Sequence, residues 1–150
     1  MANTYTSLYY HLIFSTKNRV PWIRSELEPR LWEYLGGIAR RHKMTALHVG
    51  GTADHIHAAI LAPATLSPSQ IAQALKGDSS KWIHGEIQNM CRFEWQDGYG
   101  AFTVGSYQLP ELIRYIQNQR EHHRVKTFQE EYVYLLEKHG IKYEERYLWG

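Results

Sequence analysis

The sequence contains a single cysteine, Cys91, among its 150 residues. One cysteine excludes an internal disulfide and is typical of a reducing compartment. Its apolar runs are far shorter than the roughly 18 residues that a membrane span requires, and residues 1–5 lack the charged and apolar regions of a signal peptide. With 43% hydrophobic residues, the chain can bury a core. We therefore expect one domain over residues 1–150, in the cytoplasm and without a membrane partner.

The sequence also lacks the strong positive charge that is typical of DNA-binding domains. Its formal net charge is only +2, so charge permits a nucleic-acid partner without requiring one. Basic residues are nevertheless concentrated locally, and such groups occur both as solvated helix ends and as binding surfaces. Nine histidines and eleven tyrosines add polar aromatic rings that can stack on unpaired bases. The candidate DNA contacts are Lys17, Arg19, Arg114, Arg120 and His122.

Hydrophobic periodicity predicts an alternation of strands and helices. The predicted strands are residues 6–16, 44–49, 55–62 and 99–107, and the predicted helices are residues 26–42, 68–90, 109–123 and 127–138. Ser25 with Glu28 is the pattern of a capping box, and Ser67 before Pro68 is another helix start. The order β-α-β-β-α-β predicts an α+β, ferredoxin-like (split βαβ) sandwich with an antiparallel sheet. We expect its helices to cover one sheet face and leave the other open.

A His-x-His pattern lies in the third predicted strand, after the turn-like segment 50–53. Side chains alternate between the two faces of a strand, so His55 and His57 point the same way, about 6–7 Å apart. Two imidazoles at that spacing can chelate one divalent metal ion. Ordinary, partly exposed histidines would give the same pattern. The His-x-His pattern alone therefore leaves both interpretations open.

The predicted helix after Leu109 and Pro110 carries a tyrosine beside its apolar stripe. At about 100° per residue, the stripe contains Leu109, Leu112, Ile113 and Ile116, whereas Tyr115 lies on the neighbouring face. Gln119 is one helical turn from Tyr115, within about 5–6 Å. A phenol and an amide placed in this way can supply a nucleophile and a neutral metal ligand. A solvated helix face would show the same spacing.

Taken together, these segments resemble the small single-tyrosine transposases of the HUH endonuclease superfamily, including the transposases associated with repetitive extragenic palindromes. His55-Ile56-His57 is similar to the family's His-hydrophobic-His motif, and residues 115–123 resemble its nucleophile-bearing helix. Further similar stretches are residues 10–17, 75–82, 95–102 and 139–149. The resemblance covers almost the whole chain. One mild departure is Ala58-Ala59, where bulkier aliphatic residues are expected.

The resemblance implies a transposase that cleaves single-stranded DNA and transfers the strand. Tyr115 would be the nucleophile, forming a 5′-phosphotyrosine. The sequence itself names no general base, and His122 is the nearest candidate acceptor of the proton on the same helix face. Gln119 would join His55 and His57 as ligands of Mg²⁺ or Mn²⁺, although imidazole also accepts Zn²⁺. The implied partners are single-stranded DNA with hairpin ends and a second copy of the chain. In such a homodimer, the tyrosine helix of one subunit can serve the histidines of the other.

Two other functions fit parts of this pattern. A replication-type HUH nickase uses similar chemistry, but such enzymes usually carry further domains. A non-catalytic protein that binds single-stranded nucleic acid could share the fold, because this fold hosts many unrelated functions. RNA-recognition modules place stacking aromatic residues on the central strands, where this chain has histidines instead.

Overall fold

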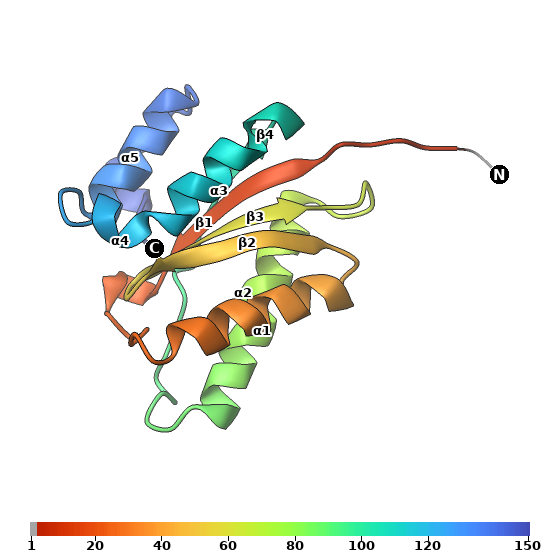
Figure 1. Cartoon of the computed structure of the whole chain (residues 1–150). Helices are drawn as coiled ribbons and strands as arrows, with labels where there is room; N and C mark the ends of the chain where they lie inside the picture. Colours follow the sequence, from red (N-terminus) through yellow and green to blue (C-terminus); the bar gives the residue numbers. More distant parts are fainter. Residues whose placement is uncertain (1–2) are drawn as a thin grey trace.

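The computed structural model describes residues 3–150; Met1 and Ala2, part of the segment without signal-peptide features, lie outside the described residues. A four-stranded antiparallel sheet forms its centre, in the order β2-β3-β1-β4 (Figure 1). The strands are β1 (Tyr9–Ser15), β2 (Thr45–Thr52), β3 (His55–Leu61) and β4 (Gly100–Val104). This topology confirms the predicted ferredoxin-like α+β fold. Among residues 3–150, no helix combines the length and apolar character that crossing a membrane requires.

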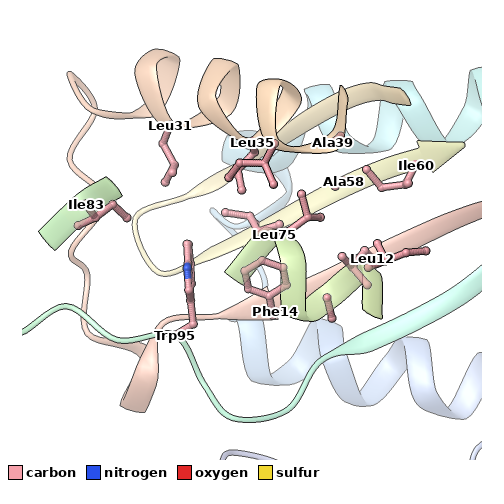
Figure 2. Packing of buried hydrophobic residues seen from close by; sticks show 14 of the residues in the cluster. Leu12, Phe14, Leu31, Leu35, Ala39, Ala58, Ile60, Leu75, Ile83 and Trp95 are labelled. Atoms are coloured by element: carbon pink, nitrogen blue, oxygen red, sulfur yellow. The ribbon is translucent and has the colours of Figure 1, made fainter. Parts of the chain in front are cut away.

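Two helices, α1 (Glu28–Arg41) and α2 (Pro68–Glu86), cover one face of this sheet (Figure 1). Leu12 and Phe14 of β1 point toward these helices, since alternate residues of a strand share a face. Figure 2 shows Leu31 and Leu35 of α1 directed at the same apolar cluster from the other side. This cluster is the main hydrophobic core, and it occupies every position on that face of the two central strands. The polar residues of β1 and β3 therefore point to the opposite face.

The opposite face is covered as well, so the expectation of an open sheet face is wrong. Helices α3 (Leu109–Gln117), α4 (Gln119–His122) and α5 (Phe128–Lys138) lie across it (Figure 1). The apolar side of α5 packs on Ile13 of β1 and Phe102 of β4, forming a second buried cluster. Burial of this apolar surface holds the C-terminal helices on the sheet. The strand histidines are consequently enclosed between two layers.

Several local boundaries differ from the predictions. Ser25 does not cap α1: the N-cap residue is Leu27, without a side-chain cap, whereas the capping box at Ser67 and the start of α2 are confirmed. The turn before β3 is shorter than the predicted segment 50–53 and consists of Ala53 and Asp54, because Gly50 and Gly51 pair with β3 inside β2. The predicted tyrosine helix is interrupted at Asn118, which separates α3 from α4. Short 3₁₀ turns occur at Lys17–Arg19, Ser106–Gln108 and Glu145–Tyr147.

Candidate active site

The floor of the site is formed by three histidines from the two central strands. β1 pairs antiparallel with β3, with Ile13 opposite His57, so His11 lies diagonally across from His57 on the same face. His55 and His57 are both fully buried, with 0% of their surface exposed. The common face of His55 and His57 is confirmed, but the expectation that they are partly solvated is wrong. The C-terminal helices account for the difference.

His55 and His57 are each held through their Nδ1 atoms. His55 Nδ1 lies 2.8 Å from Asp54 Oδ1 and 3.1 Å from Thr52 Oγ1. His57 Nδ1 lies 2.7 Å from His11 Nε2. Because a carboxylate only accepts hydrogen bonds, the Asp54 contact favours a hydrogen on His55 Nδ1 and a free lone pair on its Nε2. The Nε2 atoms of both rings then face the interior of the site.

Helix α3 reaches this floor because β2 has a glycine where the helix crosses it. A Cβ atom at Gly50 would lie 2.8 Å from Ile116 Cγ2 and 3.1 Å from the Ile116 carbonyl oxygen. The missing side chain lets the helix backbone approach the sheet closely. Ile116 is thereby buried against β2, and Tyr115 and Gln119 are brought over the histidines. A single chain therefore unites the side chains predicted on the strand and on the helix.

Gln119 contacts His55 directly. Its Oε1 lies 3.0 Å from His55 Nε2, while its Nε2 donates to the Tyr115 carbonyl oxygen and to Glu131 Oε2, each at 3.3 Å. These two acceptors orient the amide so that its oxygen faces the imidazole. Because the contact with Asp54 favours the hydrogen on His55 Nδ1, His55 Nε2 has a free lone pair. This lone pair and those of Gln119 Oε1 point to the same space, as ligand atoms do around a bound cation.

Glu131 of α5 is the functional candidate that the sequence interpretation missed. Its side chain is fully buried at 0% exposure. Oε1 lies 3.0 Å from His57 Nε2, 3.1 Å from His123 Nε2 and 3.7 Å from His55 Nε2. The sequence contains a pattern that could have identified it: Glu131 lies on the apolar face of its helix, three residues after Phe128 and four before Leu135. A carboxylate at such a position needs polar partners inside the protein.

The Tyr115 hydroxyl donates a short hydrogen bond to Glu131 Oε2. His122 Nε2 lies 3.4 Å from the same hydroxyl, so the predicted proximity of His122 is confirmed, although the contact is long. Burial, the charge of Glu131 and this hydrogen bond all raise the pKa of Tyr115 well above its usual value. The phenol is therefore protonated at neutral pH in this arrangement.

The pKa values of His57 and Glu131 favour a neutral imidazole beside an ionised carboxylate. Burial lowers the pKa of His57 to about 4, and the hydrogen bond and charge of Glu131 oppose this shift only in part. Burial acts to raise the pKa of Glu131, but hydrogen bonds from His123 and His57 outweigh it and hold that pKa well below its usual range. A metal ion binds a neutral imidazole and an ionised carboxylate, which are the forms that these pKa directions favour, and its binding would displace the hydrogen between His57 Nε2 and Glu131 Oε1.

The donor atoms fit a divalent metal ion. His55, His57, His123 and Glu131, which we call the histidine–glutamate cluster, offer one ligand atom each, all within 4.8 Å of one another. Neighbouring ligands of an octahedral ion lie roughly 3 Å apart when its bonds are about 2.1 Å long. The separations from His55 Nε2 to Gln119 Oε1 and from His57 Nε2 to Glu131 Oε1 are both 3.0 Å. The partners on the Nδ1 atoms are the supporting contacts expected of metal-binding histidines.

Three of the predicted DNA contacts, Lys17, Arg19 and Arg120, have partners within the chain. Lys17 pairs with Asp97 at 3.1 Å, and Arg120 with Glu28 at 2.6 Å. The Arg19 guanidinium donates to the Trp149 carbonyl oxygen at 3.2 Å and lies over the indole ring. Arg114 is exposed on α3. These four residues remain predictions as DNA contacts, whereas His122 is placed at the site by its approach to the tyrosine.

Comparison with known proteins identifies the family. Residues 4–119 match the family model described as "Transposase IS200 like". The chain therefore belongs to the IS200-like transposase family, and it is a DNA transposase. The transposase for insertion sequence element IS200 of Salmonella typhimurium is 27% identical over 127 residues, which cover 81% of this chain and 82% of the relative. The corresponding transposase of Salmonella typhi matches with the same identity and coverage.

Two solved structures share the fold. A putative transposase from Deinococcus radiodurans has a TM-score of 0.65 at 23% identity, over 79% of this chain and 96% of that one. A REP-associated tyrosine transposase bound to a REP hairpin has a TM-score of 0.58 at 12% identity, over 82% of this chain and 73% of that one. Identities this low support the fold of the chain and do not assign its site residues.

Proposed function

We propose that this transposase is a metal-dependent endonuclease and strand transferase for single-stranded DNA, with Tyr115 as the nucleophile. One observation carries the proposal: the Tyr115 ring lies 5.7 Å from the His57 ring, measured between centroids, next to the 3.0 Å approach of Gln119 Oε1 to His55 Nε2. The strand motif supplies two imidazoles and the helix supplies a phenol and an amide. A nucleophile next to a cation site is the arrangement that phosphodiester cleavage requires.

His55, His57 and Gln119 would hold the metal ion, Mg²⁺ or Mn²⁺. When bound, such an ion polarises the scissile phosphate and offsets the charge that develops on its oxygens. The residues around the ligands keep them in place: Asp54 and Thr52 orient His55, and His11 orients His57. Burial excludes water from this side of the site, which strengthens every electrostatic contact there.

Tyr115 would attack the phosphorus in line with the bond to the 3′ oxygen. A bond forms between the phenolic oxygen and phosphorus, and the bond from phosphorus to the 3′ oxygen breaks. The phenolic proton passes to an acceptor of the site, where Glu131 and His122 are the neighbours, and the departing 3′ oxygen takes up a proton. The products are a 5′-phosphotyrosine and a free 3′-hydroxyl. Because the covalent bond conserves the energy of the phosphodiester, the strand can be joined to another end without ATP.

The substrate can reach Tyr115 from the side facing β4 and α5. A cavity of about 290 Å³ opens there, and the tyrosine forms part of its wall. Phe102 and Leu135 contribute apolar atoms to the wall of this cavity, while Lys138 and His139 contribute polar atoms that can contact a DNA backbone. We propose single-stranded DNA with hairpin ends as the substrate. The REP-associated transposase of similar fold, bound to a REP hairpin, is consistent with this class of partner.

The proposal includes a homodimer. Within one chain the tyrosine helix contacts His55 through Gln119, so a site built from a single subunit is the alternative to exchange. In a dimer that exchanges these helices, the same contacts would form between two copies. A mixture of Tyr115→Phe and His55→Ala proteins tests the exchange, since recovered cleavage would require a site built from both chains. No recovery after proven subunit exchange would show that each chain uses its own tyrosine.

The decisive experiment for the reaction is incubation with labelled single-stranded ends of the element. We expect a covalent protein–DNA adduct that depends on Mg²⁺ or Mn²⁺ and disappears with a chelator. Peptide mapping should place the DNA on Tyr115. Cleavage without an adduct would instead indicate attack by water and would contradict the proposed nucleophile.

A further inference from the structure

We propose that Glu131 is the carboxylate of the active site, with Oε1 as a fourth metal ligand and Oε2 as the group that holds the Tyr115 hydroxyl in place. This inference rests on the proposed function and deepens it. Glu131 lies beyond residues 4–119, the part of the chain that matches the family model. The assignment therefore comes from the contacts of this chain alone.

The Oε1 side of the carboxylate faces the metal ligands. Oε1 lies 3.0 Å from His57 Nε2 and 3.7 Å from His55 Nε2, so it shares their side of the site. An ion bound by both imidazoles would have this oxygen within its reach, because ligands of one octahedral ion lie roughly 3 Å apart. A carboxylate also supplies negative charge, which the neutral set of two imidazoles and one amide lacks. Hard divalent ions favour such an oxygen ligand.

The Oε2 side of the carboxylate faces the nucleophile. Oε2 accepts a hydrogen bond from the Tyr115 hydroxyl and another from Gln119 Nε2 at 3.3 Å. His122 Nε2 lies 3.3 Å from the same oxygen. The two oxygens thus connect the cation site with the reacting atom through one rigid group. Binding of the ion to Oε1 would therefore fix the position of the phenol relative to the metal.

The helix cap, the apolar neighbours on α5 and His123 together fix the position of the Glu131 carboxylate. Thr127 begins α5 with a capping box, which sets the start of the helix one turn before Glu131. Phe128 and Tyr132, on either side along the helix, are buried in the second apolar cluster. His123 Nε2, at 3.1 Å, contacts Oε1 from the segment before the helix. A fully buried charge without a cation nearby would be costly, and a bound divalent ion removes this cost.

The test is calorimetric titration of the full chain with Mn²⁺ alone. Glu131→Gln preserves the size of the side chain and removes its charge. We expect its Mn²⁺ affinity to fall roughly tenfold or more, since even supporting contacts of metal ligands are worth about 10–100-fold. Glu130→Gln is the matched control: the neighbouring side chain is exposed, and glutamine can also complete the capping box with Thr127. Its affinity should equal that of the wild type.

Further measurements separate the two roles of Glu131. Thermal melts check that Glu131→Gln is folded. If it is unstable, Glu131→Asp replaces it in the titration. Aspartate keeps the charge but shortens the side chain, so this variant should also bind Mn²⁺ more weakly than the wild type. Unchanged affinity in a folded Glu131 variant would overturn the assignment of Oε1 as a ligand. At saturating Mn²⁺, adduct formation by Glu131→Gln should remain slower than in the wild type. Full recovery of the rate would overturn the role of Oε2.

These outcomes are independent of the proposed reaction. If the wild-type chain binds Mn²⁺ through Glu131 but forms no adduct at Tyr115, the proposed function is wrong and the ligand assignment of Oε1 stands. If the adduct forms and the Mn²⁺ affinity of Glu131→Gln is unchanged, the reaction stands and the ligand assignment is wrong.

Discussion

Replacement of Tyr115 by phenylalanine separates the chemistry of this protein from its stability. The substitution removes one oxygen atom and its hydrogen bond to Glu131 Oε2, and it retains the ring. The ring packs edge-on against His57, with centroids 5.7 Å apart, and against His122 at 5.2 Å. Phenylalanine can keep both contacts. We therefore expect the site to remain assembled.

The cost in stability can be worked out from the partners that remain. A hydrogen bond to a charged group contributes roughly 1.5–3 kcal/mol. Glu131 Oε2 still accepts from Gln119, and Oε1 keeps its contacts with His57 and His123, so no buried oxygen is left without a partner. The free energy of unfolding should thus fall by about 1.5 kcal/mol, the lower end of this range. For a chain of this size, that corresponds to a decrease in melting temperature of about 3–6 °C.

The effect on the reaction should be complete. Without the phenolic oxygen no phosphotyrosine can form, so labelled single-stranded DNA should give no covalent adduct with Tyr115→Phe, while Mn²⁺ affinity stays near that of the wild type. Tyr107→Phe is the control, because Tyr107 is 85% exposed next to the same helix and should be dispensable. An adduct in Tyr115→Phe, or one mapped to Tyr99, Tyr107 or Tyr132 in the wild type, would refute the assignment.

Three further outcomes follow from the geometry of the site. His55→Ala should lower the Mn²⁺ affinity measured by calorimetric titration. It should also destabilise the fold, because the His55 ring is buried and does not lie on a solvated face. Affinity and stability equal to those of the wild type would contradict both statements. Gly50→Ala should displace α3 from the sheet and slow adduct formation, whereas Gly77→Ala, with open space around its Cβ, should not. With a chelator present, the free energy of unfolding should fall by on the order of 3 kcal/mol as the pH drops from about 6.5 to about 4. The reason is that His57 takes up a proton in the unfolded chain across this range but stays neutral in the folded chain. Denaturant titrations at several pH values that show no such fall would argue against a buried neutral His57.

The sequence alone determined the parts of this protein that depend on local order. Hydrophobic periodicity predicted the strands and helices, and the ferredoxin-like topology followed from their order. The common face of His55 and His57 follows from the two-residue period of a strand, and the placing of Gln119 one turn after Tyr115 follows from the helical repeat. These relations hold within one element, so periodicity is enough to establish them.

Contacts between distant elements were decided only by the tertiary structure. The sequence suggested an open sheet face, since nothing local shows that α5 packs back across β1 and β4. Its packing buries the histidines and brings Glu131 to the Tyr115 hydroxyl, 16 residues away in the chain. The partner of His57 in β1, His11, is 46 residues away. Such contacts depend on how apolar faces pack in three dimensions. Burial of those faces brings the polar groups of this site together, and no local repeat in the sequence encodes it.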